Sequence, residues 1–224
     1  MIRAIYIIVE GETEEEFVNS LIQPYLYTRG IADVRAIKLS TSPGHKGGDL
    51  KFARYKRNVE NLLKREQDIL VTSLIDFYKL RTDFPDYNEA QAIRNVAERV
   101  AFLESACKEK IGNARFVPYI QLHEFEGLLF TDQRAFDILF PNLPPTQRNE
   151  LIKIINEYPN PELIDEGTET APSKRLQKLI PGYEKPLFGP MIALENGIES
   201  MLQKCPRFNE WIHLLITTAC SSTS

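Results

Sequence analysis

The stretch IYIIVEGETEEEFV, residues 5–18, decides the fold, because an apolar run ends in a glutamate and a glycine and then continues as an acidic helix. Residues 2–9 are β-branched and aromatic, which is typical of a strand buried on both faces in a parallel sheet. Thr13 and Glu16 have the spacing of a capping box, so we expect a helix to begin at Glu14. Glu10 therefore lies where a buried strand reaches the surface.

The alternation of strand and helix patterns continues to residue 131. Further strands are expected at 33–40, 68–76 and 114–122, and helices at 50–66 and 88–110. Strands that alternate with helices of this length indicate βαβ units with right-handed crossovers. We therefore predict an α/β fold, with a parallel sheet of about four core strands flanked by helices.

The composition of the sequence changes after residue 131, where prolines become frequent and helical patterns dominate. Helices are expected at 132–139, 146–157, 172–180, 188–204 and 207–218. These patterns predict an α/β core over 1–131 and a helical extension over 132–224 that packs on the core.

Composition limits the class of protein. The chain has 224 residues, 43% of them hydrophobic, and a net charge of -4, which suits one globular domain or one domain with an added lobe. No apolar run approaches the roughly 20 residues of a membrane helix, and the N-terminus lacks the features of a signal peptide. The cysteines are Cys107, Cys205 and Cys220, and their spacing matches no metal motif. We therefore expect reduced thiols in a cytoplasmic protein without membrane contact.

Acidic residues follow three of the four predicted strands. Glu10 follows the first strand, Asp76 ends the third, and Glu124 and Glu126 follow the fourth. Ligands of open α/β sheets bind beyond the carboxyl ends of the strands. If the first and third strands are neighbours, Glu10 and Asp76 lie side by side, and a cation between them would offset their repulsion. The pattern predicts a site for Mg²⁺ or Mn²⁺, because hard divalent ions prefer carboxylate oxygens.

Other acidic residues near this edge are weaker candidates. Glu14 lies one helical turn after Glu10 and is either a further ligand or a solvated first-turn acid. In HEFE, residues 123–126, Glu126 is the preferred ligand and Glu124 the alternative. His123 is either a group for proton transfer or second-sphere support, or a structural histidine.

Basic residues gather in two segments. The stretch SPGHKGGDLKFARYKR, residues 42–57, combines glycines with cations, which suits a close approach to phosphate. PSKRLQK, residues 172–178, is a second basic segment, and each segment has a solvated helix face as its alternative interpretation. The predicted nucleic-acid contacts are His45, Lys46, Arg54, Lys174 and Arg175.

The string VEGETEEEFV, residues 9–18, resembles the first motif of TOPRIM-type domains, which occur in topoisomerases, primases, recombination proteins and the overcoming-lysogenization-defect nucleases. Further strings resemble a bacterial domain-of-unknown-function family, numbered 4276, with a TOPRIM-like core. These strings are LIDFYKLRTDFP (74–85), PYIQLHEFEGLLF (118–130), PSKRL (172–176) and GPMIALENGIESMLQKCPRFNEWIHLL (189–215).

The resemblance implies a TOPRIM/Rossmann-like sheet with a divalent-metal site. The strand-end glutamate of TOPRIM nucleases matches Glu10, the helix acid four residues later matches Glu14, and the first acid of the D-x-D motif matches Asp76. The sequence departs from the motif at Tyr78, which stands where the second D-x-D acid is expected. Either Asp83 or Glu126 would then complete the site.

The predicted function is that of a divalent-metal-dependent nuclease, or a related phosphoryl-transfer enzyme acting on nucleic acid. Similar proteins are encoded beside ATPases in anti-phage systems, so the resemblance implies an ATPase partner. The alternative is a non-catalytic TOPRIM-like subunit that binds nucleic acid, a nucleotide or a partner ATPase. The candidate catalytic residues are Glu10, Asp76, Glu126, His123 and Lys46.

Overall fold

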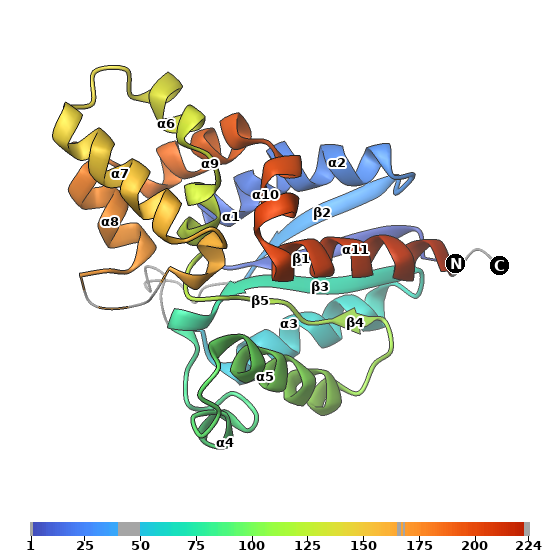
Figure 1. Cartoon of the computed structure of the whole chain (residues 1–224). Helices are drawn as coiled ribbons and strands as arrows, with labels where there is room; N and C mark the ends of the chain where they lie inside the picture. Colours follow the sequence, from blue (N-terminus) through green and yellow to red (C-terminus); the bar gives the residue numbers. More distant parts are fainter. Residues whose placement is uncertain (1, 40–49, 165–166, 168, 222–224) are drawn as a thin grey trace.

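The computed structural model describes residues 2–39, 50–164, 167 and 169–221, and their core is a parallel sheet (Figure 1). Its strands are β1 (Ala4–Val9), β2 (Asp33–Lys38), β3 (Ile69–Asp76), β4 (Phe116–Val117) and β5 (Ile120–Gln121). The order is β2-β1-β3-β4, and β5 pairs with β3 beyond the end of β4. All pairings are parallel, which confirms the predicted α/β fold.

The fourth predicted strand is divided in its middle, which corrects the expectation of one strand over 114–122. Pro118 has no N–H to donate to the sheet. At Tyr119, the Ser73 hydroxyl takes the place of the backbone hydrogen bonds between the strands. It accepts from the Tyr119 N–H at 3.1 Å and donates to the Tyr119 carbonyl at 3.0 Å. The hydroxyl of Tyr55 lies 2.8 Å from the same Ser73 oxygen.

The helix after β1 differs from the sequence prediction. Helix α1 (Glu12–Phe17) begins two residues before the expected start, after Gly11, and no side chain caps it. Thr13 is buried, and its methyl group lies 3.1 Å from where a Cβ at Gly189 would lie, so this side chain is used for packing. The predicted capping box is therefore wrong.

A π-helical turn separates α1 from the next helix. The turn covers Val18–Ile22 and leads into α2 (Gln23–Thr28), whose first turn contains Pro24. Pro24 cannot donate the backbone hydrogen bond of a regular α-helix, which accounts for the change of helical type before it.

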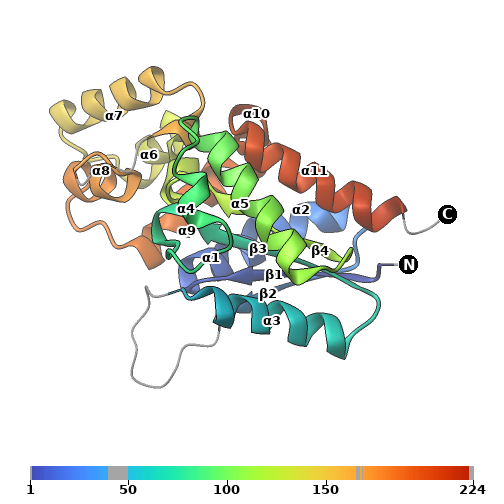
Figure 2. The same ribbon diagram turned by 90° about the horizontal axis from the view of Figure 1, so that it is seen from below.

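Helices cover both faces of the sheet (Figures 1 and 2), and each face packs into its own hydrophobic cluster. On one face, Ile5, Ile7 and Val9 of β1 join a cluster that includes α1, α2 and α11 (Pro206–Ser221). On the other face, Ala4, Tyr6 and Ile8 join a cluster that includes α3 (Phe52–Arg65) and α5 (Val96–Ile111). The strand is buried on both faces, as its apolar sequence predicted.

Two of the helices predicted from the sequence are each divided into two in the structure. The helix expected at 88–110 is divided into α4 (Tyr87–Ala90) and α5, which Asn95 caps. The helix expected at 188–204 is divided at Gly197, where φ is 74°. The other helices are α6 (Gln133–Leu139), α7 (Pro145–Glu157), α8 (Pro172–Leu179), α9 (Lys185–Asn196) and α10 (Ile198–Lys204).

Helices α6 to α9 gather around the end of the sheet at which α1 begins, and α11 returns along the sheet (Figure 1). One hydrophobic cluster includes residues from both halves of the chain, among them Phe17 of α1 and Trp211 of α11. The C-terminal helices therefore complete the covering of one sheet face. The proposed division at residue 131 stays a prediction.

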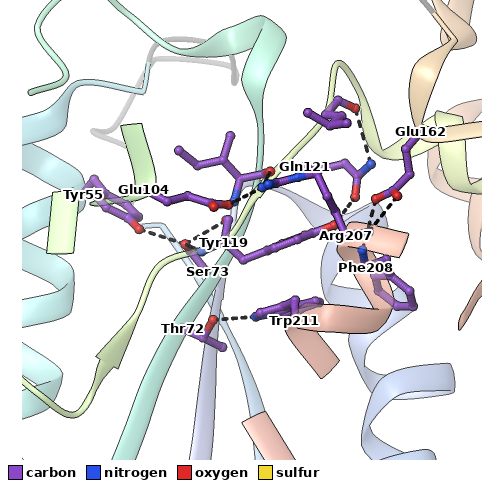
Figure 3. A network of polar contacts seen from close by, with 12 residues as sticks. Tyr55, Thr72, Ser73, Glu104, Tyr119, Gln121, Glu162, Arg207, Phe208 and Trp211 are labelled. Carbon is purple, nitrogen blue, oxygen red and sulfur yellow. Dashed lines mark hydrogen bonds and ion pairs between the residues drawn. The ribbon is translucent and has the colours of Figure 1, made fainter. Parts of the chain in front are cut away.

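A buried polar network, here called the Glu104–Arg207 cluster, attaches α11 to the sheet (Figure 3). Glu104 Oε1 accepts from Arg207 Nη2 at 2.7 Å and from the Ile120 N–H at 2.8 Å. Glu162 accepts from the N–H groups of Arg207 and Phe208, the first turn of α11, at 3.0 and 3.1 Å. A buried carboxylate thus caps this helix from a distant part of the chain.

An aromatic contact continues this attachment. Tyr119 stacks on Trp211, with ring centroids 4.3 Å apart and planes 9° apart. Trp211 donates to the buried Thr72 hydroxyl of β3 at 2.8 Å. Trp211 is therefore a core residue.

Two further predictions concern thiols and membranes. Cys107 and Cys205 are buried and Cys220 is exposed, and all three are free thiols. Burial raises the pKa of Cys107 to about 12, so this thiol stays protonated at neutral pH. None of the helices in the described ranges is long and apolar enough to cross a membrane.

Candidate metal and phosphoryl-transfer site

The acids at the ends of β1 and β3 meet, as the sequence predicted. The two strands pair in parallel, with Val9 opposite Leu74. Glu10 Oε1 accepts from the Asp76 N–H at 3.0 Å. Asp76 Oδ1 in turn accepts from the Phe125 N–H at 2.8 Å. These two hydrogen bonds join the ends of β1 and β3 to the segment after β5.

Four carboxylates form what we call the acid cluster, namely Glu10, Glu14, Asp76 and Glu126. Three of them surround the ammonium of Lys185, the first residue of α9. Lys185 Nζ lies 3.1 Å from Glu14 Oε1, 3.1 Å from Glu126 Oε2 and 3.9 Å from Asp76 Oδ2. The sequence prediction missed Lys185, because nothing in its neighbourhood indicates that α9 begins beside β1 and β3.

Three side chains of the acid cluster are buried, and Glu10 is half-buried. The side chains of Glu14, Asp76 and Glu126 are 5%, 2% and 1% exposed. Burial raises the pKa of Glu126 to about 7; Lys185 opposes this shift, and Asp76 adds to it. Burial lowers the pKa of Lys185, but Asp76, Glu126 and Glu14 raise it well above its ordinary value, so the ammonium stays charged.

Tyr183 adds a polar atom near the acid cluster. Its hydroxyl is buried and has no hydrogen-bond partner among the described residues. Burial raises the pKa of Tyr183, and the charges of Glu126, Lys185 and Glu124 also act on it. A buried hydroxyl without a partner is costly, so this position suits a ligand or water from outside the chain.

The two other residues of HEFE have different surroundings. Glu124 accepts from the Ser173 N–H at 3.0 Å and from the Ser173 hydroxyl at 3.1 Å, so it caps the start of α8. His123 is buried, with a left-handed backbone (φ 57°), and its carbonyl accepts from the Tyr78 N–H at 3.0 Å. Their predicted roles as ligand and proton-transfer group stay predictions.

Two positions bear on the missing D-x-D acid. Tyr78 is 55% exposed and brings no carboxylate to the edge of the sheet. Asp83 accepts from the Phe52 N–H at 3.0 Å, at the start of α3. Of the two acids proposed to complete the site, Glu126 is the one that lies beside Lys185 and Asp76.

Three of the predicted nucleic-acid contacts lie on described residues, at the starts of α3 and α8. Arg54 is half-buried in the first turn of α3, which Asp83 contacts, and Lys174 is exposed beside Ser173. Arg175 donates to the Thr170 carbonyl at 2.6 Å and lies over the ring of Tyr158. The predictions for His45 and Lys46 fall outside the described residues.

Residues 9–216 match the family model described as Domain of unknown function (DUF4276). The chain belongs to this family. Because the match covers most of the chain, the recognition made from the sequence strings is confirmed at the level of the family. No curated protein matches the chain.

Two solved structures resemble this DUF4276 chain in fold. The C-terminal region of the Burkholderia pseudomallei OLD protein is 14% identical, with a TM-score of 0.46, over 96% of this chain and 99% of that one. The C-terminal region of the Xanthomonas campestris pv. campestris OLD protein is 16% identical, with a TM-score of 0.42, over 95% of each chain.

The carboxylates of this DUF4276 chain are the type of ligand that a hard divalent cation prefers, but their positions are not those of a formed metal site. Within the described ranges, no three His, Cys, Asp or Glu side chains are already arranged as a metal site. The carboxylates are held instead at ammonium distances from Lys185, longer than the ~2.1 Å of a Mg²⁺–oxygen bond. Buried carboxylates that lie close together, and the Tyr183 hydroxyl without a partner among the described residues, are nevertheless groups that such an ion would satisfy.

Proposed function

We propose that this chain is a divalent-metal-dependent phosphoryl-transfer enzyme acting on nucleic acid, with a TOPRIM-like core and nuclease activity. The observation that carries the proposal is the convergence of Glu14, Asp76 and Glu126 on one cationic point at the carboxyl edge of the sheet. The resemblance of residues 9–18 to a TOPRIM motif supports the same chemistry.

Glu10, Glu14, Asp76 and Glu126 would hold Mg²⁺ or Mn²⁺. Such an ion, when bound, polarises a phosphoryl oxygen and lowers the pKa of a bound water. Without a bound ion, burial raises the pKa of Glu126 to about 7, so binding of a cation would release its proton near neutral pH. Burial of Glu14, Asp76 and Glu126 excludes water around them and strengthens their interaction with a cation.

The basic segments supply the attraction for the nucleic-acid backbone. Arg54 and Lys174 belong to the first turns of α3 and α8. These turns contact Asp83, which follows β3, and Glu124, which follows β5. Cations at this edge would neutralise phosphates on either side of the scissile bond, with the strong salt dependence typical of such contacts.

The test is a cleavage assay on supercoiled, linear and single-stranded DNA and on RNA, with Mg²⁺ or Mn²⁺. Wild type is compared with Glu10→Gln and Asp76→Asn, and with Asp33→Asn as a matched control. Asp33 lies at the opposite edge of the sheet, where it pairs with Arg35 at 2.6 Å. We expect cleavage by wild type and Asp33→Asn and none by the two cluster variants. Cleavage that survives both cluster substitutions would overturn the assignment of the site.

A second candidate is a non-catalytic subunit that binds nucleic acid, a nucleotide or a partner ATPase. Tyr78 favours it, because an exposed tyrosine stands where the resemblance expects a second metal-binding acid. If no substrate is cleaved, with or without an ATPase encoded beside the gene, while nucleic acid is still bound, this candidate replaces the nuclease. A role in anti-phage defence belongs to either candidate and stays a prediction.

A further inference from the structure

Lys185 is the residue at the acid cluster to which neither the family model nor the sequence motifs assign a role. Its ammonium is close to three carboxylates from three different segments, namely Glu14 of α1, Asp76 of β3 and Glu126 of the segment after β5. It also lies 5.8 Å from the centroid of the Phe125 ring. The ammonium therefore lies among carboxylates that would otherwise repel one another.

The packing of α9 fixes this position. Gly189, one turn after Lys185, faces Thr13 of α1, and a Cβ at Gly189 would lie only 3.1 Å from the Thr13 methyl group. Absence of a side chain at Gly189 thus allows α9 to approach α1 closely. The approach places the first residue of α9 beside Glu14.

Charge and space leave little room for two cations at this point. Lys185 Nζ lies 3.1 Å from Glu14 and from Glu126 and 3.9 Å from Asp76, so the ammonium already occupies the space between these carboxylates. A divalent ion bound by these carboxylates would need oxygens at ~2.1 Å. It would lie almost where the ammonium lies, and two cations in contact in a buried place repel strongly.

We propose that Lys185 is the resident counter-ion of the acid cluster, and that its ammonium and a divalent cation exclude each other. The inference rests on the proposed function, which assigns a divalent cation to this cluster. In the metal-free protein, the ammonium of Lys185 offsets the repulsion among the carboxylates. A metal ion must displace this ammonium in order to bind, so Lys185 lowers the metal affinity of the site.

The first experiment compares Mn²⁺ and Mg²⁺ binding by isothermal titration calorimetry in wild type, Lys185→Met and Lys178→Met. Lys178 is an exposed lysine in the last turn of α8 and serves as the matched control. We expect Lys185→Met to bind metal about 10-fold more tightly or better, equivalent to about 1.4 kcal/mol, and Lys178→Met to bind like wild type. We also expect Lys185→Met to melt at lower temperature in EDTA and to show the larger upward shift with Mn²⁺.

Equal or weaker metal binding by Lys185→Met would overturn the role of Lys185 and leave the metal site intact. No metal binding by any of the three proteins would overturn the proposed metal site and this inference with it. The two failures are therefore distinguishable.

A second experiment needs no variant and covers the case in which Lys185→Met does not fold. Wild type is treated with a limiting amount of acetic anhydride, with and without Mg²⁺, and acetylation of Lys185 and Lys178 is quantified by mass spectrometry. We expect Mg²⁺ to raise the modification of Lys185 relative to Lys178 at least threefold, because the displaced ammonium leaves its carboxylates. An unchanged or lowered ratio, in protein that calorimetry shows to bind metal, would overturn the inference.

Discussion

The acid cluster and the Glu104–Arg207 cluster are both largely buried and ionic, but they differ in which groups surround their carboxylates. In the Glu104–Arg207 cluster, Glu104 faces one arginine and one backbone N–H, and Glu162 faces two backbone N–H groups at a helix start. In the acid cluster, three buried carboxylates from three different segments lie around the ammonium of Lys185.

The pKa shifts reflect this difference. Burial raises the pKa of Glu104 and of Glu162, and in each case Arg207 or the backbone donors oppose the shift. Burial also raises the pKa of Glu126, but there the neighbouring Asp76 and Glu124 reinforce it. A buried cluster with matched charges stabilises one arrangement, whereas an excess of one sign is costly unless a ligand offsets it.

The largest expected effect on activity separates two neighbouring glutamates of α1. Glu14 belongs to the acid cluster, whereas Glu15 pairs with Lys38 at the surface, at 2.8 Å. Because loss of an outer-sphere group at a metal site already costs 10–100-fold, we expect Glu14→Gln to lower kcat/KM for cleavage about 100-fold. The measurement is steady-state cleavage of the best substrate with saturating Mg²⁺.

Glu15→Gln is the matched control for that measurement, and its kcat/KM should stay within about twofold of wild type, because it removes only an exposed ion pair. Equal activity of the two variants would mean that Glu14 has a structural role only. The acid cluster would then be a structural cluster, like the Glu104–Arg207 cluster.

Substitution in the Glu104–Arg207 cluster should lower the stability of the fold. Glu104→Ala leaves the guanidinium of Arg207, whose side chain is 16% exposed, without its carboxylate, which we expect to lower the free energy of unfolding by at most about 3–5 kcal/mol. Urea unfolding followed by circular dichroism measures this loss, and the metal affinity of the folded variant should not change. A loss below about 1 kcal/mol would show that the pair behaves like an exposed salt bridge.

The pH dependence of stability should depend on Glu126. Its pKa is about 7 in the folded chain and 4.5 ordinarily, so between these values the folded state holds a proton that the unfolded state has released. Stability in EDTA should therefore fall as pH rises from 4.5 to 7, by up to about 3 kcal/mol. Urea unfolding of wild type and Glu126→Gln across this range measures the contribution, and parallel curves for the two proteins would contradict it.

The smallest expected effect concerns the attachment of α11. Trp211→Phe keeps an aromatic ring against Tyr119 but leaves the buried Thr72 hydroxyl without its donor. We expect a loss of about 1–2 kcal/mol in the free energy of unfolding, with cleavage unchanged. Thermal melting followed by circular dichroism measures the loss. Impaired metal binding by Trp211→Phe would show that the Glu104–Arg207 cluster and the acid cluster are coupled.

The sequence alone determined the class of fold and the edge of the sheet at which the acids meet. The apolar run of residues 2–9 required burial on both faces, and alternating strand and helix patterns required parallel pairing. Parallel strands bring their carboxyl ends to one edge, so Glu10 and Asp76 had to lie near each other once β1 and β3 were neighbours.

Local detail was less predictable, because it depends on contacts that lie far apart in the chain. The Thr13 methyl packs near Gly189, and the helix starts earlier than its capping residues indicate. The interruption at Pro118 could be read from the sequence, since proline cannot donate within a sheet. The hydroxyl of Ser73 that bridges it could not.

Only the tertiary structure decided which cation faces the acids. Lys185 lies 59 residues from Glu126 along the chain, and no local pattern distinguishes it from the other lysines. Its position follows from the close packing of α9 on α1, which is a property of two surfaces in contact. Periodicity and strand ends are local and survive in a sequence, whereas the balance of charge in a buried cluster is set by segments that meet only after folding.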